Sequence, residues 1–169
     1  GQRGAMIADM LIKHGGYELW AVADYFEPVA RAASERFGVP EARRFSGLSA
    51  CEKLVASGVD AVFLETPPYC FPEHVEAAVQ AGRHVYIAKP LGCDVPGCLK
   101  ISQMAKKATA NKQVFLVDFQ TRTDPFFIEG VHRVREGAIG PVAMLSSEYN
   151  DESFSDPPKT ATIESRLQQ

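Results

Sequence analysis

The strongest constraint on the fold is the alternation of short apolar runs with helical stretches. Three of the expected helices end just before a glycine, a common helix stop: Pro28–Phe37, Leu48–Ser57 and Pro72–Ala81. Another helix is expected over Val95–Ala110. Strands are expected at the apolar runs Glu18–Asp24, Val59–Leu64, residues 85–87 and Val114–Phe119, and a short strand is expected at Arg43–Phe45. Because strands that alternate with helices lie parallel and are joined by right-handed crossovers, the sequence predicts an α/β fold with a doubly wound parallel sheet.

Length and composition limit the number of domains and the classes of partner. The 169 residues suffice for one full domain and part of a second. The net charge of -3 gives no reason to expect nucleic acid, and no apolar run approaches the roughly 20 residues of a membrane span. The four cysteines form no CxxC pair and no zinc-type cluster, so we expect reduced thiols and no metal site. Reduced thiols favour a cytoplasmic protein, with an export signal before residue 1 left open.

A pair of glycines opens the first expected helix. Gly1 and Gly4 flank Gln2 and Arg3, and the helical pattern that follows stops at Gly15. Such a turn lets a phosphate approach the free N–H groups at the positive end of a helix. The dinucleotide fingerprint G-x-G-x-x-G needs another glycine and a strand before it, and we expect both to precede residue 1. All four residues are then expected to contact the cofactor, although a plain helix-initiating turn explains the pair about as well.

An aspartate at the tip of the second strand supports the dinucleotide interpretation. Asp24 follows Gly4 by 20 residues, the spacing at which an acid accepts hydrogen bonds from the adenosine ribose. The alternative is a helix N-cap before Pro28, and both roles are compatible. Asp24 would repel the 2′-phosphate of NADP, and Tyr25 beside it supplies no cation, so NAD is the expected cofactor and NADP the less favoured one.

Lys89 lies at the carboxyl end of the strand at residues 85–87, just before Pro90. Ligands bind at this edge of an open parallel sheet. A lysine desolvated in a cleft has a lowered pKa, which suits it to exchange the proton of a hydroxyl group, and its charge favours a developing alkoxide. We therefore expect Lys89 to be catalytic and, with Pro90, to contact the cofactor; an exposed surface lysine is the alternative.

Other residues near strand ends have two interpretations each. Thr66 and Pro67 are expected to line the cofactor cleft, although a simple turn also explains them. Arg122 either reaches the cofactor or substrate or forms an interdomain salt bridge, and Asp118 is ambiguous in the same way. His84 is expected to be a packed or capping histidine.

The pattern changes after Gln120, where a second domain is expected to begin. Pro125–Glu136 is predicted to be an amphipathic helix, and Val142–Tyr149 the first strand of a new sheet. The polar tail Asn150–Gln169 is not expected to complete a domain. The sequence thus predicts a dinucleotide-binding Rossmann domain at 1–120 and an incomplete C-terminal α/β domain at 121–169.

Several of these motifs together resemble one family of oxidoreductases. They are Thr66-Pro67-Pro68, His84-Val85-Tyr86, Lys89-Pro90, Gln120-Thr121-Arg122 and Glu136-Gly137-Ala138-Ile139-Gly140. In order and spacing they resemble the glucose-fructose oxidoreductase, inositol dehydrogenase and MocA family over nearly the whole chain. The resemblance implies a nicotinamide cofactor that exchanges a hydride with a sugar or polyol. It also implies a C-terminal α/β domain whose open sheet mediates contacts in a homo-oligomer, a dimer or tetramer.

The resemblance assigns roles to individual residues and also shows two departures. Lys89 matches the family lysine that contacts the substrate hydroxyl and helps its proton leave. The family signature reads Glu-Lys-Pro, whereas this chain has Ala88 before the lysine. Phe71 stands where many relatives carry a histidine, and His74 follows three residues later.

The expected function is a NAD-dependent oxidoreductase acting on a sugar, polyol or related hydroxylated small molecule. Two alternatives stay open: a glycosidase or lyase that recycles bound NAD, and a non-catalytic nucleotide-binding relative, which the two departures favour. Relatives supply further site residues from the C-terminal domain. We therefore expect residues 1–169 alone to be inactive and to belong to a protein of about 300 residues or more.

Overall fold

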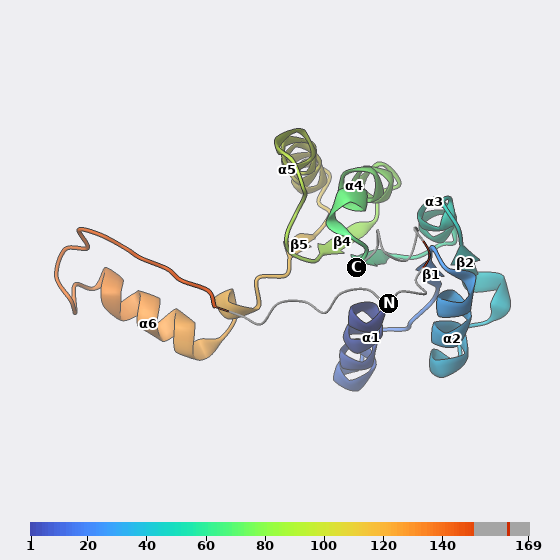
Figure 1. Ribbon diagram of the computed structural model, residues 1–169, viewed down its shortest axis with the longest axis horizontal. Coiled ribbons are helices and arrows are strands. Elements are labelled where there is room, and N and C mark those ends of the chain that lie inside the picture. The colour runs from blue at the N-terminus through green and yellow to red at the C-terminus, as the bar shows by residue number, and fades with distance from the viewer. Residues whose placement is uncertain (151–161, 163–169) are drawn as a thin grey trace. The chain divides into compact units, whose positions relative to one another are not determined.

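The computed structural model describes residues 1–150 and residue 162. The chain divides into two compact units, Gly1–Asp118 and Phe119–Gln169. Figure 1 shows the described residues of the first unit in blue to yellow-green and those of the second in orange to red. The division of roles expected for residues 1–120 and 121–169, cofactor binding and substrate or subunit contacts, stays a prediction.

The first unit contains the helices expected from the glycine stops and the helix expected over Val95–Ala110. They are α1 (Gln2–His14), α2 (Glu27–Phe37), α3 (Ala50–Ala56), α4 (Phe71–Gln80) and α5 (Val95–Ala110). Gly38 ends α2 in the left-handed conformation at φ 68°, which a residue without a Cβ adopts at little cost. The Asp94 side chain caps α5 by accepting a hydrogen bond of 2.7 Å from the Gly97 N–H. Short 3₁₀ turns span Glu41–Arg43 and Pro68–Cys70.

The strands of this unit are all parallel, as the alternation predicts. They are β1 (Val22–Asp24), β2 (Arg44–Ser46), β3 (Ala61–Leu64), β4 (His84–Ile87) and β5 (Phe115–Val117). β1 pairs with β2, and β4 lies between β3 and β5. The two ladders share no hydrogen bonds among the described residues, and the strand expected before residue 1 stays a prediction. β1 is shorter than the apolar run Glu18–Asp24 because its partner β2 has only three residues to pair with.

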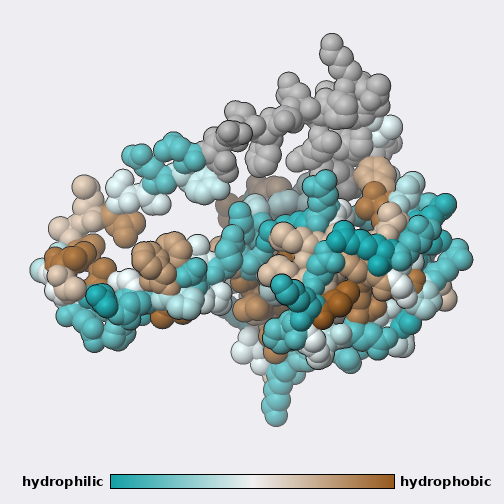
Figure 2. Space-filling view, turned by 90° about the horizontal axis from the view of Figure 1, so that it is seen from below, coloured by the Kyte–Doolittle hydropathy of each residue, from teal (hydrophilic) through white to brown (hydrophobic). Residues whose placement is uncertain are grey.

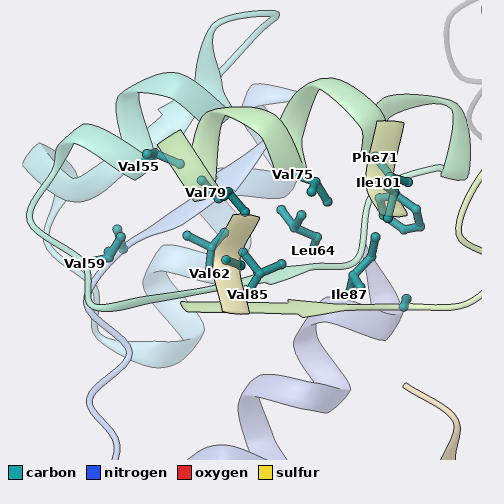
Figure 3. Close-up of a cluster of buried hydrophobic side chains, with 14 residues drawn as sticks. Val55, Val59, Val62, Leu64, Phe71, Val75, Val79, Val85, Ile87 and Ile101 are labelled. Atoms are coloured by element: carbon teal, nitrogen blue, oxygen red, sulfur yellow. The ribbon is translucent and has the colours of Figure 1, made fainter. Parts of the chain in front are cut away.

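The core lies between the sheet and the helices α3, α4 and α5. Figure 3 shows Phe71, Val75 and Val79 of α4 facing the side chains of β3 and β4. The buried strand residues on this face are Val62, Leu64, Val85 and Ile87. Because side chains alternate across a strand, Phe63 and Tyr86 face the other side, where their rings stack at 4.9 Å.

The opposite face of the sheet carries α1 and is only partly covered. Figure 2, turned to view the molecule from below, shows hydrophobic residues exposed among polar ones. A shallow hollow of about 270 Å³ lies there, lined by Ile7, Met10, Leu11, His14, Tyr17, Phe63 and Tyr86. The two faces of the sheet therefore differ: α4 and α5 seal one, and α1 leaves space on the other.

The second unit contains one described α-helix, α6 (Pro125–Arg135), preceded by a 3₁₀ turn at Gln120–Arg122. Asp124 caps α6 by accepting a hydrogen bond of 2.8 Å from the Phe126 N–H. The strand predicted at Val142–Tyr149 is wrong, because these residues form no strand and pair with no described segment. Most of the expected tail Asn150–Gln169 lies outside the described residues. Within the described part of the chain, no helix is long and apolar enough to cross a membrane.

Candidate functional site

The carboxyl ends of the strands carry the polar residues of the candidate site. Asp24 ends β1, and Glu65 and Thr66 follow β3. Lys89 comes two residues after the end of β4, and Asp118 directly follows β5. The site therefore lies at the edge of the sheet where ligands bind in open α/β folds.

The glycine turn and Asp24 lie together at this edge. Gly1 is the N-cap of α1, and its nitrogen, the terminal amino group of this chain, donates a hydrogen bond of 2.9 Å to Asp24 Oδ2. Asp24 Oδ1 accepts a second bond of 3.0 Å from the Phe26 N–H. The N-cap of α2 is Phe26, so the helix-cap interpretation of Asp24 is wrong, and the carboxylate instead shapes the turn between β1 and α2. Tyr25 lies in that turn and is 38% exposed.

Arg3 has a different position from the one expected. Its guanidinium forms ion pairs with Glu65, at 2.9 Å from Nε to Oε2, and with Asp118 through Nη2. The two carboxylate side chains are only 7% and 9% exposed. The Arg3 side chain therefore links α1 to the ends of β3 and β5, and the expected contact of Arg3 with the cofactor stays a prediction.

Glu65 is a site residue that sequence reasoning missed. Its signal in the sequence is a lone acid directly after the apolar run of β3, at the same edge as Asp24 and Asp118. Burial raises the pKa of Glu65 above its ordinary value, while the nearby Arg3 charge acts in the opposite direction. Burial, followed by the hydrogen bond to Asp118, raises the pKa of Tyr86 to about 12.

Thr66 is held by a histidine. Thr66 Oγ1 lies 3.1 Å from His74 Nδ1, across the turn between β3 and α4. Burial lowers the pKa of His74, opposed by Glu52 and Glu73, so the imidazole is neutral near pH 7. Pro67 is the N-cap of the 3₁₀ turn that follows Thr66. The contact fixes the direction of the Thr66 hydroxyl, a role for His74 that spacing alone does not reveal.

The two departures from the family signature are both buried apolar residues. Phe71 is 1% exposed and belongs to the core beneath α4, and Ala88 is 4% exposed. Neither side chain is polar, so neither offers a hydrogen bond to a ligand at this edge.

Lys89 is exposed, and the Lys89–Pro90 peptide bond is cis. The expectation that Lys89 is desolvated in a cleft is therefore wrong for the described residues. The ammonium group lies at the carboxyl edge beyond β4, where its charge faces solvent.

Of the remaining candidates, His84 has a structural role, whereas the predicted roles of Arg122 stay open. His84 Nδ1 accepts a hydrogen bond of 2.8 Å from the Val114 N–H, which confirms its structural role. Arg122 belongs to the second unit, where its guanidinium lies 4.8 Å from the centre of the Phe119 ring. Its predicted roles toward the cofactor or another domain stay predictions. Among the described residues, no group of three or more His, Cys, Asp or Glu side chains is placed to hold a metal ion.

Comparison with known proteins identifies the family. A family model described as "Oxidoreductase family, NAD-binding Rossmann fold" matches residues 1–116. The chain belongs to the Gfo/Idh/MocA family. This confirms both the resemblance found in the motifs and the predicted Rossmann fold.

Relatives of this family member include an inositol dehydrogenase and an aldose oxidoreductase. Inositol 2-dehydrogenase of Rhizobium meliloti is 29% identical over 156 residues, which are 90% of this chain and 44% of that protein. The aldose-aldose oxidoreductase of Caulobacter crescentus, solved with glycerol, superposes with a TM-score of 0.61 at 26% identity, covering 73% of this chain and 36% of that one.

A third relative was solved with the phosphorylated cofactor. It is a 3-ketoreductase of Actinomadura kijaniata in complex with TDP-benzene and NADP, with a TM-score of 0.57 and 27% identity over 73% of this chain and 36% of that one. The chain thus spans less than half the length of each of these relatives.

Proposed function

We propose that the full-length protein is a NAD-dependent oxidoreductase that transfers a hydride between the nicotinamide and a sugar, polyol or related hydroxylated small molecule. The observation that carries the proposal is the placement of the α1 N-terminus and Asp24 together where parallel strands end, which sets free helix N–H groups beside a carboxylate that suits a ribose. The inositol dehydrogenase and aldose oxidoreductase relatives support the substrate class.

The residues at this edge fit a dinucleotide. The first-turn N–H groups of α1, at Gly1–Gly4, suit a diphosphate, because they lack partners within the helix and lie at its positive end. Asp24 suits the two ribose hydroxyls, since a carboxylate accepts from both. Thr66 presents a hydroxyl whose direction His74 fixes. The preference for NAD over NADP rests on the Asp24 charge, even though a relative binds NADP.

The bound nicotinamide would accept or supply the hydride. Lys89 is proposed to contact the substrate hydroxyl: as a neutral amine it would take up the hydroxyl proton while the carbon is oxidised, and as an ammonium group it would return that proton during reduction. The exposed position of Lys89 leaves its side-chain nitrogen free to meet a substrate entering from solvent. Because Ala88 is apolar and buried, the lysine acts without a carboxylate at the preceding position.

One observation favours a second candidate, a non-catalytic nucleotide-binding protein. Phe71 and Ala88 are both buried in the core. This edge therefore lacks the histidine and the glutamate that the family resemblance would place at these two positions. Such a protein would bind NAD through the α1 turn and Asp24 without reducing it.

A redox assay on the full-length protein separates these functions. The purified protein is incubated with NAD and a panel of sugars and inositols, and the absorbance of reduced nicotinamide is followed. Net release of NADH supports the dehydrogenase. Reduction of bound NAD without net release indicates the recycling glycosidase or lyase, and NAD binding without any redox change across the panel would contradict both enzyme proposals.

A further inference from the structure

A cluster beneath the glycine turn carries more negative than positive charge, and its two carboxylates are buried whereas the Arg3 side chain is 41% exposed. One guanidinium, that of Arg3, faces two carboxylates, Glu65 and Asp118. The groups come from three different segments: α1, the end of β3 and the end of β5. With both acids ionised the cluster has a net charge of about −1, which a low-dielectric site disfavours.

The two carboxylates differ in the hydrogen bonds that they accept. Asp118 accepts a hydrogen bond from Arg3 Nη2 and one from the Tyr86 hydroxyl. Neither oxygen of Glu65 has a hydrogen-bond partner among the described residues, and both are buried from solvent. Its 2.9 Å ion pair with Arg3 Nε attracts the charge without a well-aligned hydrogen bond. An ionised carboxylate in this state is costly, so Glu65 is the member of the cluster that takes up a proton.

Glu65 lies directly against the proposed phosphate-binding turn. A Cβ built on Gly4 would be 3.8 Å from the Glu65 Cβ, so the first turn of α1 packs on this side chain. The positive end of a helix stabilises one nearby negative charge. A bound diphosphate and an ionised Glu65 would both place negative charge at the N-terminus of α1, and the two charges would repel each other.

We propose that binding of the dinucleotide is coupled to uptake of a proton by Glu65. The inference rests on the proposed function, since it needs a diphosphate at the α1 turn. When the diphosphate binds, its negative charge favours the neutral form of Glu65, and by reciprocity the neutral form binds the dinucleotide more tightly.

The sign of the coupling follows from the groups that face Glu65. Arg3, at the start of α1, favours its ionised form, whereas burial and Asp118 favour the neutral form. Burial has the largest effect, so the pKa of Glu65 lies above its ordinary value before any ligand binds. A bound dianion raises the pKa of Glu65 further. Affinity for NAD therefore falls as the pH rises between these two pKa values, by at most about tenfold per pH unit for one proton.

The test is a calorimetric titration of the full-length protein with NAD between about pH 5 and about pH 8.5, in buffers of different ionisation enthalpy. The wild type should take up a fraction of one proton per NAD and lose affinity as the pH rises. Glu65→Gln, which mimics the neutral acid, should bind NAD at high pH at least as tightly as the wild type, with proton uptake abolished. Glu35→Gln, an exposed change on α2, should retain the wild-type uptake.

A second variant keeps the inference testable if Glu65→Gln does not fold. Asp118→Asn removes a charge that favours neutral Glu65, so the loss of affinity should move to lower pH. Unchanged proton uptake in Glu65→Gln, or an unshifted pH profile in Asp118→Asn, would overturn the inference. NAD binding without any pH dependence would overturn the proton-uptake inference and leave the proposed function standing. A failure to bind NAD at any pH would overturn both.

Discussion

Replacing Asp24 by asparagine should reduce or reverse the preference for NAD. The Asp24 side chain is 17% exposed, and asparagine keeps an oxygen for the 3.0 Å bond from the Phe26 N–H. A hydrogen bond to a charged acceptor exceeds a neutral one by about 1 kcal/mol, so NAD should bind roughly fivefold to tenfold more weakly. Removing the carboxylate also removes a repulsion of about 1 to 4 kcal/mol per charge at 4 Å from the NADP 2′-phosphate. Asp24→Asn should therefore bind NADP at least roughly tenfold more tightly than the wild type does.

The assay is a pair of equilibrium titrations, one with NAD and one with NADP, on the full-length wild type and on Asp24→Asn. Asp60→Asn is the matched control, because Asp60 is exposed and precedes β3 at the opposite edge of the sheet. The control should leave both affinities unchanged. The reasoning would be refuted if Asp24→Asn bound the two cofactors in the wild-type ratio, or if the wild type preferred NADP.

Three further substitutions test the site and the core. Lys89→Ala should reduce turnover by about 10² or more with little change in NAD affinity, whereas Lys106→Ala should change neither turnover nor affinity. Equal losses in rate and binding would instead make Lys89 a cofactor contact. Ile87 is fully buried, so Ile87→Ala should lower the free energy of unfolding, measured with urea, by about 2 to 5 kcal/mol. Leu116 is half-exposed, so Leu116→Ala should lower it much less. Equal losses from the two substitutions would contradict the assigned core. His74→Phe removes the hydrogen bond to the threonine after β3 and should weaken NAD binding about twofold to tenfold, and an unchanged dissociation constant would count against that role.

Local signals in the sequence were enough to predict most of the first unit. The helix Val95–Ala110 has the predicted bounds, because Asp94 caps it and Pro96 suits its first turn. Gly38 and Gly82 both adopt positive φ after the helices they were expected to stop. The 20-residue spacing predicted that Asp24 and the glycine turn both contact one dinucleotide; the structure places them together, and the contact with the cofactor stays a prediction.

What the sequence did not predict depends on contacts between distant residues. The ion pairs of Arg3 with Glu65 and Asp118 join positions far apart in the chain, and no spacing rule connects them. The apolar pattern at Val142–Tyr149 predicted a strand, but a strand forms only where a neighbour accepts its hydrogen bonds. The exposure of Lys89 likewise depends on what surrounds the end of β4 in space rather than on its neighbours in sequence.

The central claim is that a dinucleotide binds where the α1 turn meets Asp24. The most direct test is a crystal structure of the full-length protein grown with NAD. The account predicts the diphosphate within hydrogen-bond distance of the first-turn N–H groups at Gly1–Gly4, with the Asp24 carboxylate on the adenosine ribose hydroxyls. NAD bound at another part of the protein, with no contact between the Asp24 carboxylate and the adenosine ribose, would contradict it.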